Sequence, residues 1–202
     1  NDKLAQEACE IEINVLGKPI GKQDQYIAAF GGLRCFRFHK EGSVSVNTPK
    51  VANETLINLN QNLLLFFTGK TRQAADVLRK QKKNIGDKIM LLKKMRDQVD
   101  ELLDYLDHGD LEYFGKTLEK NWKYKKQLAD GITNPEIDKM CKRAMKAGTK
   151  GGKIAGAGGG GFLLLFVPLD KQTSVRSALK DYRELPFSLA RDGSKSIFNI
   201  RR

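Results

Sequence analysis

The sequence is short of the residue types that most metal sites and disulfide frameworks require. Only three cysteines and two histidines occur among 202 residues, and they are scattered along the chain. An odd number of dispersed cysteines indicates reduced thiols in a cytoplasmic compartment. The absence of any Cys or His cluster argues against a zinc site. We therefore expect a cytoplasmic protein whose fold depends on neither a disulfide nor a zinc ion.

Long hydrophobic runs are also missing. The longest apolar run, Phe162 to Leu169, is far shorter than the roughly 20 residues that a helix needs to cross a bilayer. No basic stretch followed by an apolar one opens the chain, so no signal peptide is predicted. Hydrophobic residues make up 40% of the chain and charged residues 30%, which is typical of a globular protein. This length allows one hydrophobic core, or a core plus a small subdomain, and no membrane partner is expected.

Acidic residues are outnumbered by basic ones. Lysine and arginine total 36 against 24 acids, which gives a net charge of +12. Such a surplus is compatible with nucleic acid, phosphorylated small molecules or an acidic partner, and equally with a lysine-rich solvated surface. Aromatic residues make up only 8%, and no basic segment is interleaved with them as in an RNA-stacking platform. A nucleic-acid-binding module therefore stays an alternative, and we expect no nucleic-acid partner.

The spacing of apolar residues predicts a mixture of helices and strands. Helices are expected over 2–16, 23–30, 85–106, 111–128, 135–147 and 174–182, and strands over 33–38, 43–46, 63–67, 162–167, 185–189 and 196–200. The apolar stripe over 85–106 indicates a helix that packs on the core. This mixed order argues for an α+β or α/β arrangement of helices on a sheet. Because helical spacing starts immediately after Asn1, the chain resembles the C-terminal part of something longer.

A glycine-rich segment precedes the apolar run that starts at Phe162. Seven of the 19 glycines fall between residues 151 and 161, and Gly156-Ala157-Gly158-Gly159-Gly160-Gly161 forms its centre. Such density lets backbone amides turn inward at positive φ and lets a ligand or another loop approach closely. A phosphate cradle and close backbone packing against a neighbouring phosphate loop are both compatible with this pattern. A flexible linker is the weaker interpretation, because linkers are not flanked by buried strands.

A second candidate is Gly21-Lys22-Gln23-Asp24, at the start of the helix predicted over 23–30. Asp24 falls in the first turn, where the helix dipole favours a charged carboxylate. An ionised carboxylate can act as a base or orient a hydroxyl in phosphoryl transfer. A first-turn aspartate can also do no more than stabilise its helix, and position alone favours that simpler role.

The two stretches together resemble a known family. Gly-x-x-Asp-Gln-Tyr followed by Phe-Gly-Gly, and later Gly-Gly-Lys-Ile-Ala-Gly-Ala-Gly-Gly-Gly-Gly-Phe, is similar to the galactokinase, homoserine kinase, mevalonate kinase and phosphomevalonate kinase superfamily, the GHMP kinases. Intervening stretches resemble the heptose 7-phosphate kinase branch, among them Gly109-Asp110-Leu111, Trp122 with Lys125-Lys126, and Asn134-Pro135-Glu136. The resemblance covers nearly the whole chain.

The resemblance implies transfer of the γ-phosphoryl group of ATP, with Mg²⁺, onto a hydroxyl of a small metabolite. In the heptose branch that hydroxyl is the anomeric C1 hydroxyl of D-glycero-D-manno-heptose 7-phosphate. Another sugar or a mevalonate-type alcohol is the alternative acceptor, and a non-catalytic fragment or binding module is a further alternative. By the same resemblance Asp24 is the catalytic residue, Gly21, Lys22, Gln23 and Arg72 bind substrate, and Gly156 to Gly161 lie beside the phosphate loop.

The resemblance also implies an α+β fold in two parts. Residues 1–50 would complete an N-terminal substrate and ATP domain, and residues 51–202 would form a ferredoxin-like C-terminal domain with added helices. The family's Gly-Leu-Gly-Ser-Ser-type phosphate loop, with its magnesium-binding side chains, is found nowhere in this sequence. We therefore assign no metal ligand, and expect the N-terminal half of the same enzyme as a partner.

Several basic residues lie near these motifs. Lys22, Arg34, Arg37, Lys70 and Arg72 could steer or hold anionic substrates, although surface solvation is the simpler role for any one of them.

Overall fold

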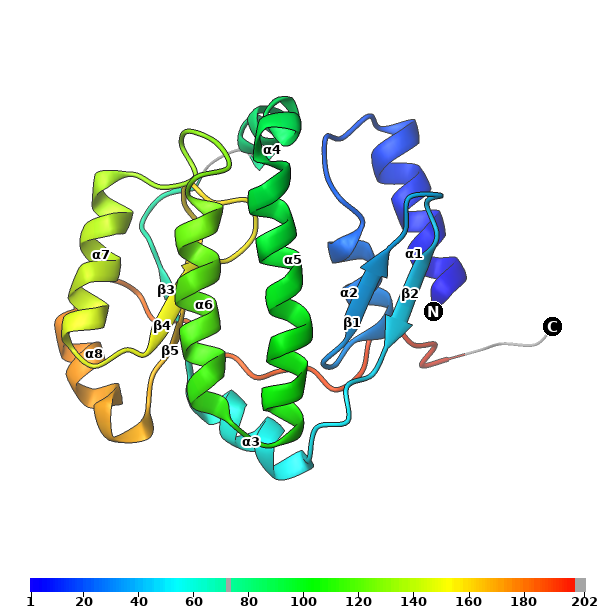
Figure 1. Cartoon of the computed structure of the whole chain (residues 1–202). Helices are drawn as coiled ribbons and strands as arrows, with labels where there is room; N and C mark the ends of the chain where they lie inside the picture. The colour runs from blue at the N-terminus through cyan, green and yellow to red at the C-terminus, as the bar shows by residue number, and fades with distance from the viewer. Residues whose placement is uncertain (72–73, 199–202) are drawn as a thin grey trace. The chain divides into compact units, whose positions relative to one another are not determined.

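The computed structural model describes residues 1–71 and 74–198 (Figure 1). The chain divides into two compact units. The first comprises Asn1–Lys50 and the segment from Ser188, and the second comprises Val51–Phe187. No helix among the described residues is both long enough and apolar enough to span a bilayer.

The first unit is a helical pair packed on a hairpin. Helix α1 (Asp2–Cys9) runs on into a π-helical stretch (Glu10–Val15), and α2 (Gln23–Phe30) follows. Strands β1 (Cys35–Phe38) and β2 (Val44–Asn47) pair antiparallel. These four elements confirm the predicted helices over 2–16 and 23–30 and the predicted hairpin. Their core is formed by Ala5, Cys9, Tyr26 and Ala29.

The segment after Ser188 packs against the end of α2. The Gly32 amide donates to the Ala190 carbonyl at 3.1 Å, and the Ser194 amide donates to the Ala28 carbonyl at 2.9 Å. Gly31 has φ +63°, and any Cβ there would overlap the Asp192–Gly193 backbone. The sequence-based division grouped this segment with the second domain, whereas its contacts lie in the first unit. No strand forms over 196–198, and the rest of the strand predicted there lies outside the described residues.

The second unit is built on an antiparallel sheet of order β3-β5-β4, with β3 (Leu63–Phe67), β4 (Gly151–Ile154) and β5 (Phe162–Phe166). A fourth segment adds a single bridge, Phe66 to Glu184, beside β3. The strand predicted over 185–189 is therefore wrong. Pro186 has no amide to donate, so pairing stops after the Leu185 amide bonds the Leu65 carbonyl at 2.8 Å. This order is nevertheless that of a ferredoxin-like sheet, with its edge strand reduced to one bridge.

Six helices of the second unit are described, together with a short 3₁₀ turn (Leu169–Lys171). They are α3 (Asn53–Gln61), α4 (Ala74–Lys83), α5 (Ile85–Asp107), α6 (Leu111–Lys125), α7 (Pro135–Lys146) and α8 (Gln172–Ala178). Side chains cap two of these helices at their N-termini. Asp110 accepts from the Tyr113 amide at 3.1 Å, and Asn134 accepts from the amides of Glu136 and Ile137. Helix α3 was not predicted, because its sequence NETLINLNQ has only a weak apolar stripe.

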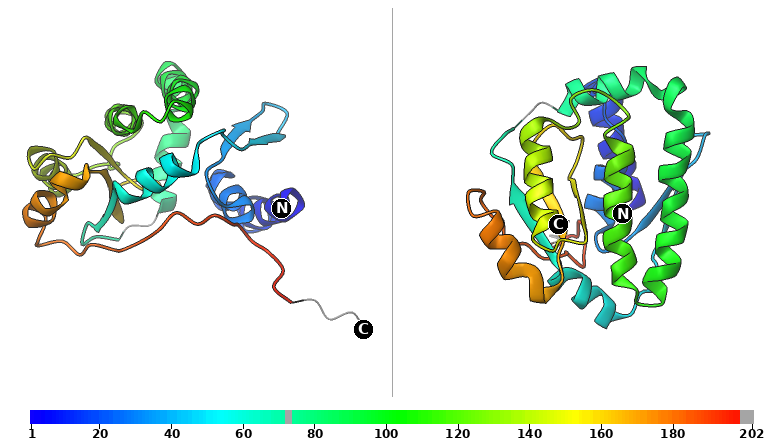
Figure 2. Two further views of the ribbon diagram at one scale, coloured as in Figure 1. Left: turned by 90° about the horizontal axis from the view of Figure 1, so that it is seen from below. Right: turned by 60° about the vertical axis from the view of Figure 1, so that its left-hand side comes forward.

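Both faces of the sheet are covered by helices. Leu163 and Leu165 of β5 pack in one core cluster with residues of α7 and α8. The alternate residues Leu164 and Phe166 pack in another cluster with Phe114 of α6. Figure 2 shows α7 beside α8, and α5 beside α6. The predicted stripe of α5 is only partly buried, since Ile85, Ile89 and Val99 remain exposed while Leu92 and Met95 pack on the core.

Helix α6 approaches β4 very closely. A Cβ on Gly151 would overlap the Gly115 carbonyl, and a Cβ on Gly115 would lie 2.9 Å from the ring of Phe166. Both residues are buried, and the missing side chains let the helix backbone rest on the strand. The contact fixes where the later turns of α6 meet the end of β4.

We expect Gly151→Ala to lower the free energy of unfolding by about 3 kcal/mol or more, because the added methyl must push α6 off the sheet. Urea denaturation of the purified chain measures this change. Gly86→Ala is the matched control, since Gly86 lies in α5 with no other atom within 4 Å of the added Cβ. It should be neutral or stabilise by up to about 1 kcal/mol. Equal effects of the two variants would contradict the packing argument.

Candidate functional site

The start of α2 holds four of the predicted site residues. Lys22 is the N-cap residue, and its Nζ donates to the Gly42 carbonyl at 2.8 Å, so it ties the helix start to the β1–β2 turn. Gln25, one residue after Asp24, is buried. The nitrogen of its side-chain amide donates to the Gly21 and Lys22 carbonyls at 3.1 and 3.3 Å. Gly21 and Gln23 are exposed. The helix start is therefore held by contacts that leave its outer side open.

Asp24 is exposed in the first turn of α2. Its carboxylate forms no hydrogen bond or ion pair with the residues that the structure describes. The neighbouring Tyr26 is buried in the core, and burial raises the pKa of its phenol. The carboxylate is thus free to accept a proton or a hydrogen bond from a ligand.

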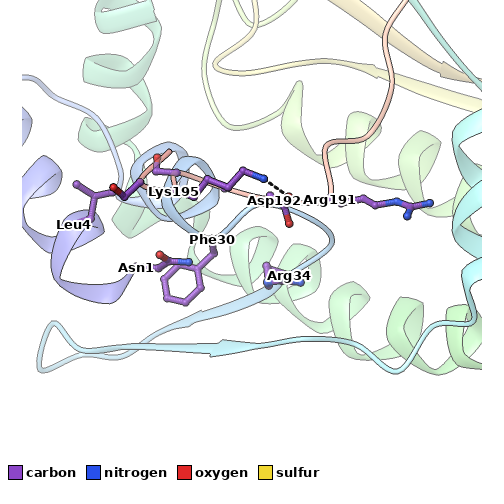
Figure 3. Close-up of a pocket in the computed structure, with 10 residues that line it drawn as sticks. Asn1, Leu4, Phe30, Arg34, Arg191, Asp192 and Lys195 are labelled. Carbon is purple, nitrogen blue, oxygen red and sulfur yellow. Dashed lines mark hydrogen bonds and ion pairs between the residues drawn. The ribbon is translucent and has the colours of Figure 1, made fainter. Parts of the chain in front are cut away.

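A cavity of about 810 Å³ opens in the same unit, between α1, the end of α2 and the segment from Arg191 (Figure 3). Arg34, Arg191 and Lys195 contribute positive charge to its lining. Lys195 pairs with Asp192 at 2.7 Å, a bond that lowers the pKa of the Asp192 carboxyl, and Arg34 donates to the Leu33 carbonyl at 2.9 Å. None of the residues Gly21 to Asp24 lines this cavity. The predicted catalytic residue thus lies on an open surface of the unit.

The glycine-rich segment forms the loop between β4 and β5 in the second unit. Gly156, Gly158, Gly159 and Gly161 all have positive φ. The Gly159 amide donates to the Ile132 carbonyl at 2.7 Å, and the Gly161 amide donates to the Lys70 carbonyl at 2.8 Å. The loop is therefore fastened by its own backbone, and the flexible-linker interpretation does not describe it.

The turn after β3 is bonded to the same loop. Thr68 is buried, and both its amide and its hydroxyl donate to the Gly161 carbonyl at 2.9 Å. A Cβ on Gly158 would lie 2.8 Å from the Ile132 carbonyl, and one on Gly160 would lie 2.7 Å from the Lys70 carbonyl. Glycine is required at these positions because neighbouring backbone already occupies the space. Among the described residues, no acceptor bonds the amides of Ala157 or Gly158.

Two lysines lie beside the loop. The ammonium group of Lys125, the last residue of α6, donates a hydrogen bond to the Gly156 carbonyl. The ammonium group of Lys153, on β4, donates to Asn121 Oδ1 at 2.8 Å. Burial, together with the charge of Lys153, lowers the pKa of Lys125 to about 8, and burial lowers the pKa of Lys153. The sequence argument did not single out Lys153. Its position directly before the glycine segment is the signal that could have identified it.

A second cavity, of about 480 Å³, involves other residues of the same unit. Trp122, Lys126, Asp138 and Cys141 are among those lining it. Burial raises the pKa of the Cys141 thiol to about 11, so this thiol stays protonated near neutral pH and is a poor nucleophile. Lys126 pairs with Asp138 at 3.4 Å.

The predicted site residues thus fall into two groups. Gly21, Lys22, Gln23 and Asp24 are together at the start of α2 in the first unit, and Gly156 to Gly161 are together in the second. Arg72 lies outside the described residues. The side chain of Lys70 forms an ion pair with Glu136, and its backbone carbonyl accepts a hydrogen bond from the Gly161 amide of the glycine loop.

Comparison with known proteins relates the chain to one kinase superfamily. Residues 102–184 match the family of GHMP kinases C terminal. The chain is 32% identical over 198 residues to D-glycero-alpha-D-manno-heptose 7-phosphate kinase of Campylobacter jejuni, a match that covers 96% of this chain and 58% of the relative. It is 25% identical over 213 residues to galactokinase of Pyrococcus furiosus, covering 89% of this chain and 57% of that protein. The chain therefore spans a little over half the length of these curated relatives.

A solved structure agrees with these matches. The crystal structure of a D-glycero-D-manno-heptose 1-phosphate kinase from Bacteroides thetaiotaomicron superposes with a TM-score of 0.62 at 28% identity, over 94% of this chain and 52% of that one. These likenesses confirm the predicted α+β fold of the GHMP kinases. Residues 102–184 match the C-terminal domain of the GHMP kinases, and the chain as a whole is similar to kinases of this superfamily.

Proposed function

We propose that this chain is the C-terminal portion of an ATP-dependent sugar kinase whose acceptor is the anomeric C1 hydroxyl of D-glycero-D-manno-heptose 7-phosphate. The observation that carries the proposal is the 32% identity with the Campylobacter jejuni kinase across 96% of this chain. Because the chain spans 58% of that relative, the remaining parts of the active site, including a phosphate-binding loop, would come from an N-terminal half of the same enzyme.

Asp24 is the base or orienting group in this proposal. Its support is the open carboxylate in the first turn of α2, which has no partner among the described residues. In an in-line transfer the acceptor hydroxyl needs an oxygen nearby that takes or directs its proton. Gly21, Lys22 and Gln23 would border the acceptor beside it. Arg72 stays a prediction for the same role.

The glycine loop would border the phosphates of ATP. Its support is the rigid backbone from Gly156 to Gly161, with amides at Ala157 and Gly158 that donate to no described acceptor. Fixed amides that point at developing negative charge stabilise it without reorganisation. The loop can also serve as the packing surface for a phosphate loop supplied from outside the chain.

The described part of the chain contains no cluster of metal-binding side chains. Over residues 1–71 and 74–198, no group of three or more His, Cys, Asp or Glu side chains could hold a metal ion. Mg²⁺ that accompanies a nucleotide is usually held by one or two carboxylates together with the phosphates. Mg²⁺ therefore stays part of the proposal as the ion that ATP brings, and none of the described residues is assigned to hold it.

A second acceptor class is supported by other relatives. The chain is also 28% identical over 211 residues to mevalonate kinase of Saccharolobus solfataricus, and it matches galactokinase as described above. Another sugar or a mevalonate-type alcohol is therefore the alternative acceptor.

The first test is ADP release with Mg-ATP in the complete enzyme and in this chain alone. We expect the complete enzyme to turn over heptose 7-phosphate at least about tenfold faster than galactose or mevalonate, because only one acceptor fits the pocket fully. This chain alone should release no ADP. Faster turnover of galactose or mevalonate would contradict the acceptor assignment, and no turnover of any acceptor would contradict the kinase proposal.

In the complete enzyme, Asp24→Asn should lower kcat by about 10²- to 10⁴-fold, because the acceptor hydroxyl loses its base. The unfolding midpoint should change little, since the side chain is exposed. Asp87→Asn is the matched control, as Asp87 is exposed in the first turn of α5 and has no described partner. Steady-state kinetics of both variants decide the role, and a normal kcat for Asp24→Asn would rule out a base.

Gly158→Ala should lower kcat/KM for ATP by roughly tenfold or more, because the methyl group would displace the loop from the Ile132 carbonyl. Gly156→Ala is the control: its φ is also positive, +71° against +103° at Gly158, but no atom lies within 4 Å of the added Cβ, so it introduces a side chain at positive φ without the overlap. If both variants lose the same amount, strain and not loop position explains the loss.

A further inference from the structure

Two lysines beside the glycine loop, Lys125 and Lys153, have no acidic partner among the described residues. Lys125 bonds the Gly156 carbonyl and Lys153 bonds Asn121, both of which are neutral acceptors. Neither lysine forms an ion pair with any residue in the described ranges. Burial and, after it, the charge of Lys153 lower the pKa of Lys125, the direction expected for like charges that repel each other. Two partly buried cations without a counter-charge are costly to hold together.

The fold places both lysines there by the close helix–strand packing already described. Gly151 faces α6, and side chains alternate along a strand, so Lys153 lies on the same face of β4 as Gly151. Lys125 ends the same helix that contacts Gly151 through Gly115, so both ammonium groups lie where α6 passes the end of β4. The backbone positions of both lysines are therefore fixed by the packing of α6 on β4.

Two side-chain amides lie on the other side of Lys153. Asn121 accepts from Lys153 at 2.8 Å and donates to Gln98 Oε1 at 3.5 Å. Gln98 is only 4% exposed, and its Nε2 is buried without a partner. The group thus combines two ammonium donors, one unpaired amide donor and, in the adjoining loop, the unbonded amides of Ala157 and Gly158. Every group in this set that lacks a partner is a donor.

We propose that Lys125 and Lys153 form a phosphate-binding site beside the glycine loop, and that a phosphate group of a substrate supplies the missing negative charge. A phosphate dianion would satisfy both ammonium groups at once, and charge-assisted bonds of this kind are stronger than neutral ones. Within the proposed kinase function, on which this assignment to a substrate rests, the group is the phosphate that the acceptor already contains or one of the phosphates of ATP.

Binding of three probes to the purified chain tests the site: inorganic phosphate, heptose 7-phosphate and Mg-ATP, each by calorimetry and by amide chemical shifts of the ¹⁵N-labelled protein. We expect inorganic phosphate and one of the substrates to shift the Ala157 and Gly158 amides. Lys125→Gln and Lys153→Met should each weaken that binding by about tenfold to a hundredfold. Lys125→Gln keeps a donor for the Gly156 carbonyl, so it removes charge without removing the bond.

Lys120→Met is the matched control, because Lys120 is exposed on the same helix without a described partner and its loss changes net charge equally. It should bind every probe as the unaltered chain does. Loss of heptose 7-phosphate binding alone would assign the site to the acceptor, and loss of Mg-ATP binding alone would assign it to the nucleotide. Unchanged binding of all probes by Lys125→Gln and Lys153→Met would overturn the proposal.

This test is independent of turnover. If inorganic phosphate binds through the two lysines but the complete enzyme releases no ADP, the kinase proposal fails while the phosphate site stands. If ADP release is normal and the lysine variants bind and turn over as the control does, the site fails while the kinase proposal stands.

Discussion

The contact between Gly115 and Gly151 is the constraint on which the second unit most depends. Two backbones can approach so closely only where neither has a side chain, and here a helix and a strand share that property. The contact sets the position of α6 along β4. The positions of Lys125, Lys153 and the glycine loop all follow from it, because each is a fixed number of residues further along one of these two rigid elements.

The glycine loop depends on a second kind of constraint. Its glycines could form a mobile tether, yet the loop is fastened to Ile132, Thr68 and Lys70 by backbone hydrogen bonds. At Gly158 and Gly160 the absence of a side chain lets neighbouring carbonyls pack against the loop backbone, in the space that a Cβ would fill. The same residue type that usually increases conformational freedom here permits a rigid arrangement, because only glycine can enter such close contact.

Much of this fold could be predicted from the sequence, because the strongest signals were local. The apolar run over 63–67 predicts β3, and Asn134 marks the start of α7; in both cases the signal lies in the element itself or directly beside it. Helix α3 was missed because its apolar stripe is weak, and the strand over 185–189 failed at Pro186. The site was harder to predict. Motif order predicts Asp24 and the glycine loop as site residues, and this stays a prediction. The proximity of Lys125 and Lys153 depends on a helix crossing a strand, which no local pattern encodes.

The division of the first unit has a consequence for biosynthesis. Its core includes Tyr26 and Ala29, yet the backbone bonds to Ala28 and Gly32 come from Ala190 and Ser194. Since a chain emerges from the ribosome from its N-terminus, the 137 residues of Val51–Phe187 are made before those bonds can form. The second unit is continuous and can fold while synthesis proceeds. The first unit can form its backbone bonds at the end of α2 only after residues 190–194 have been made, so this part of its structure is completed last.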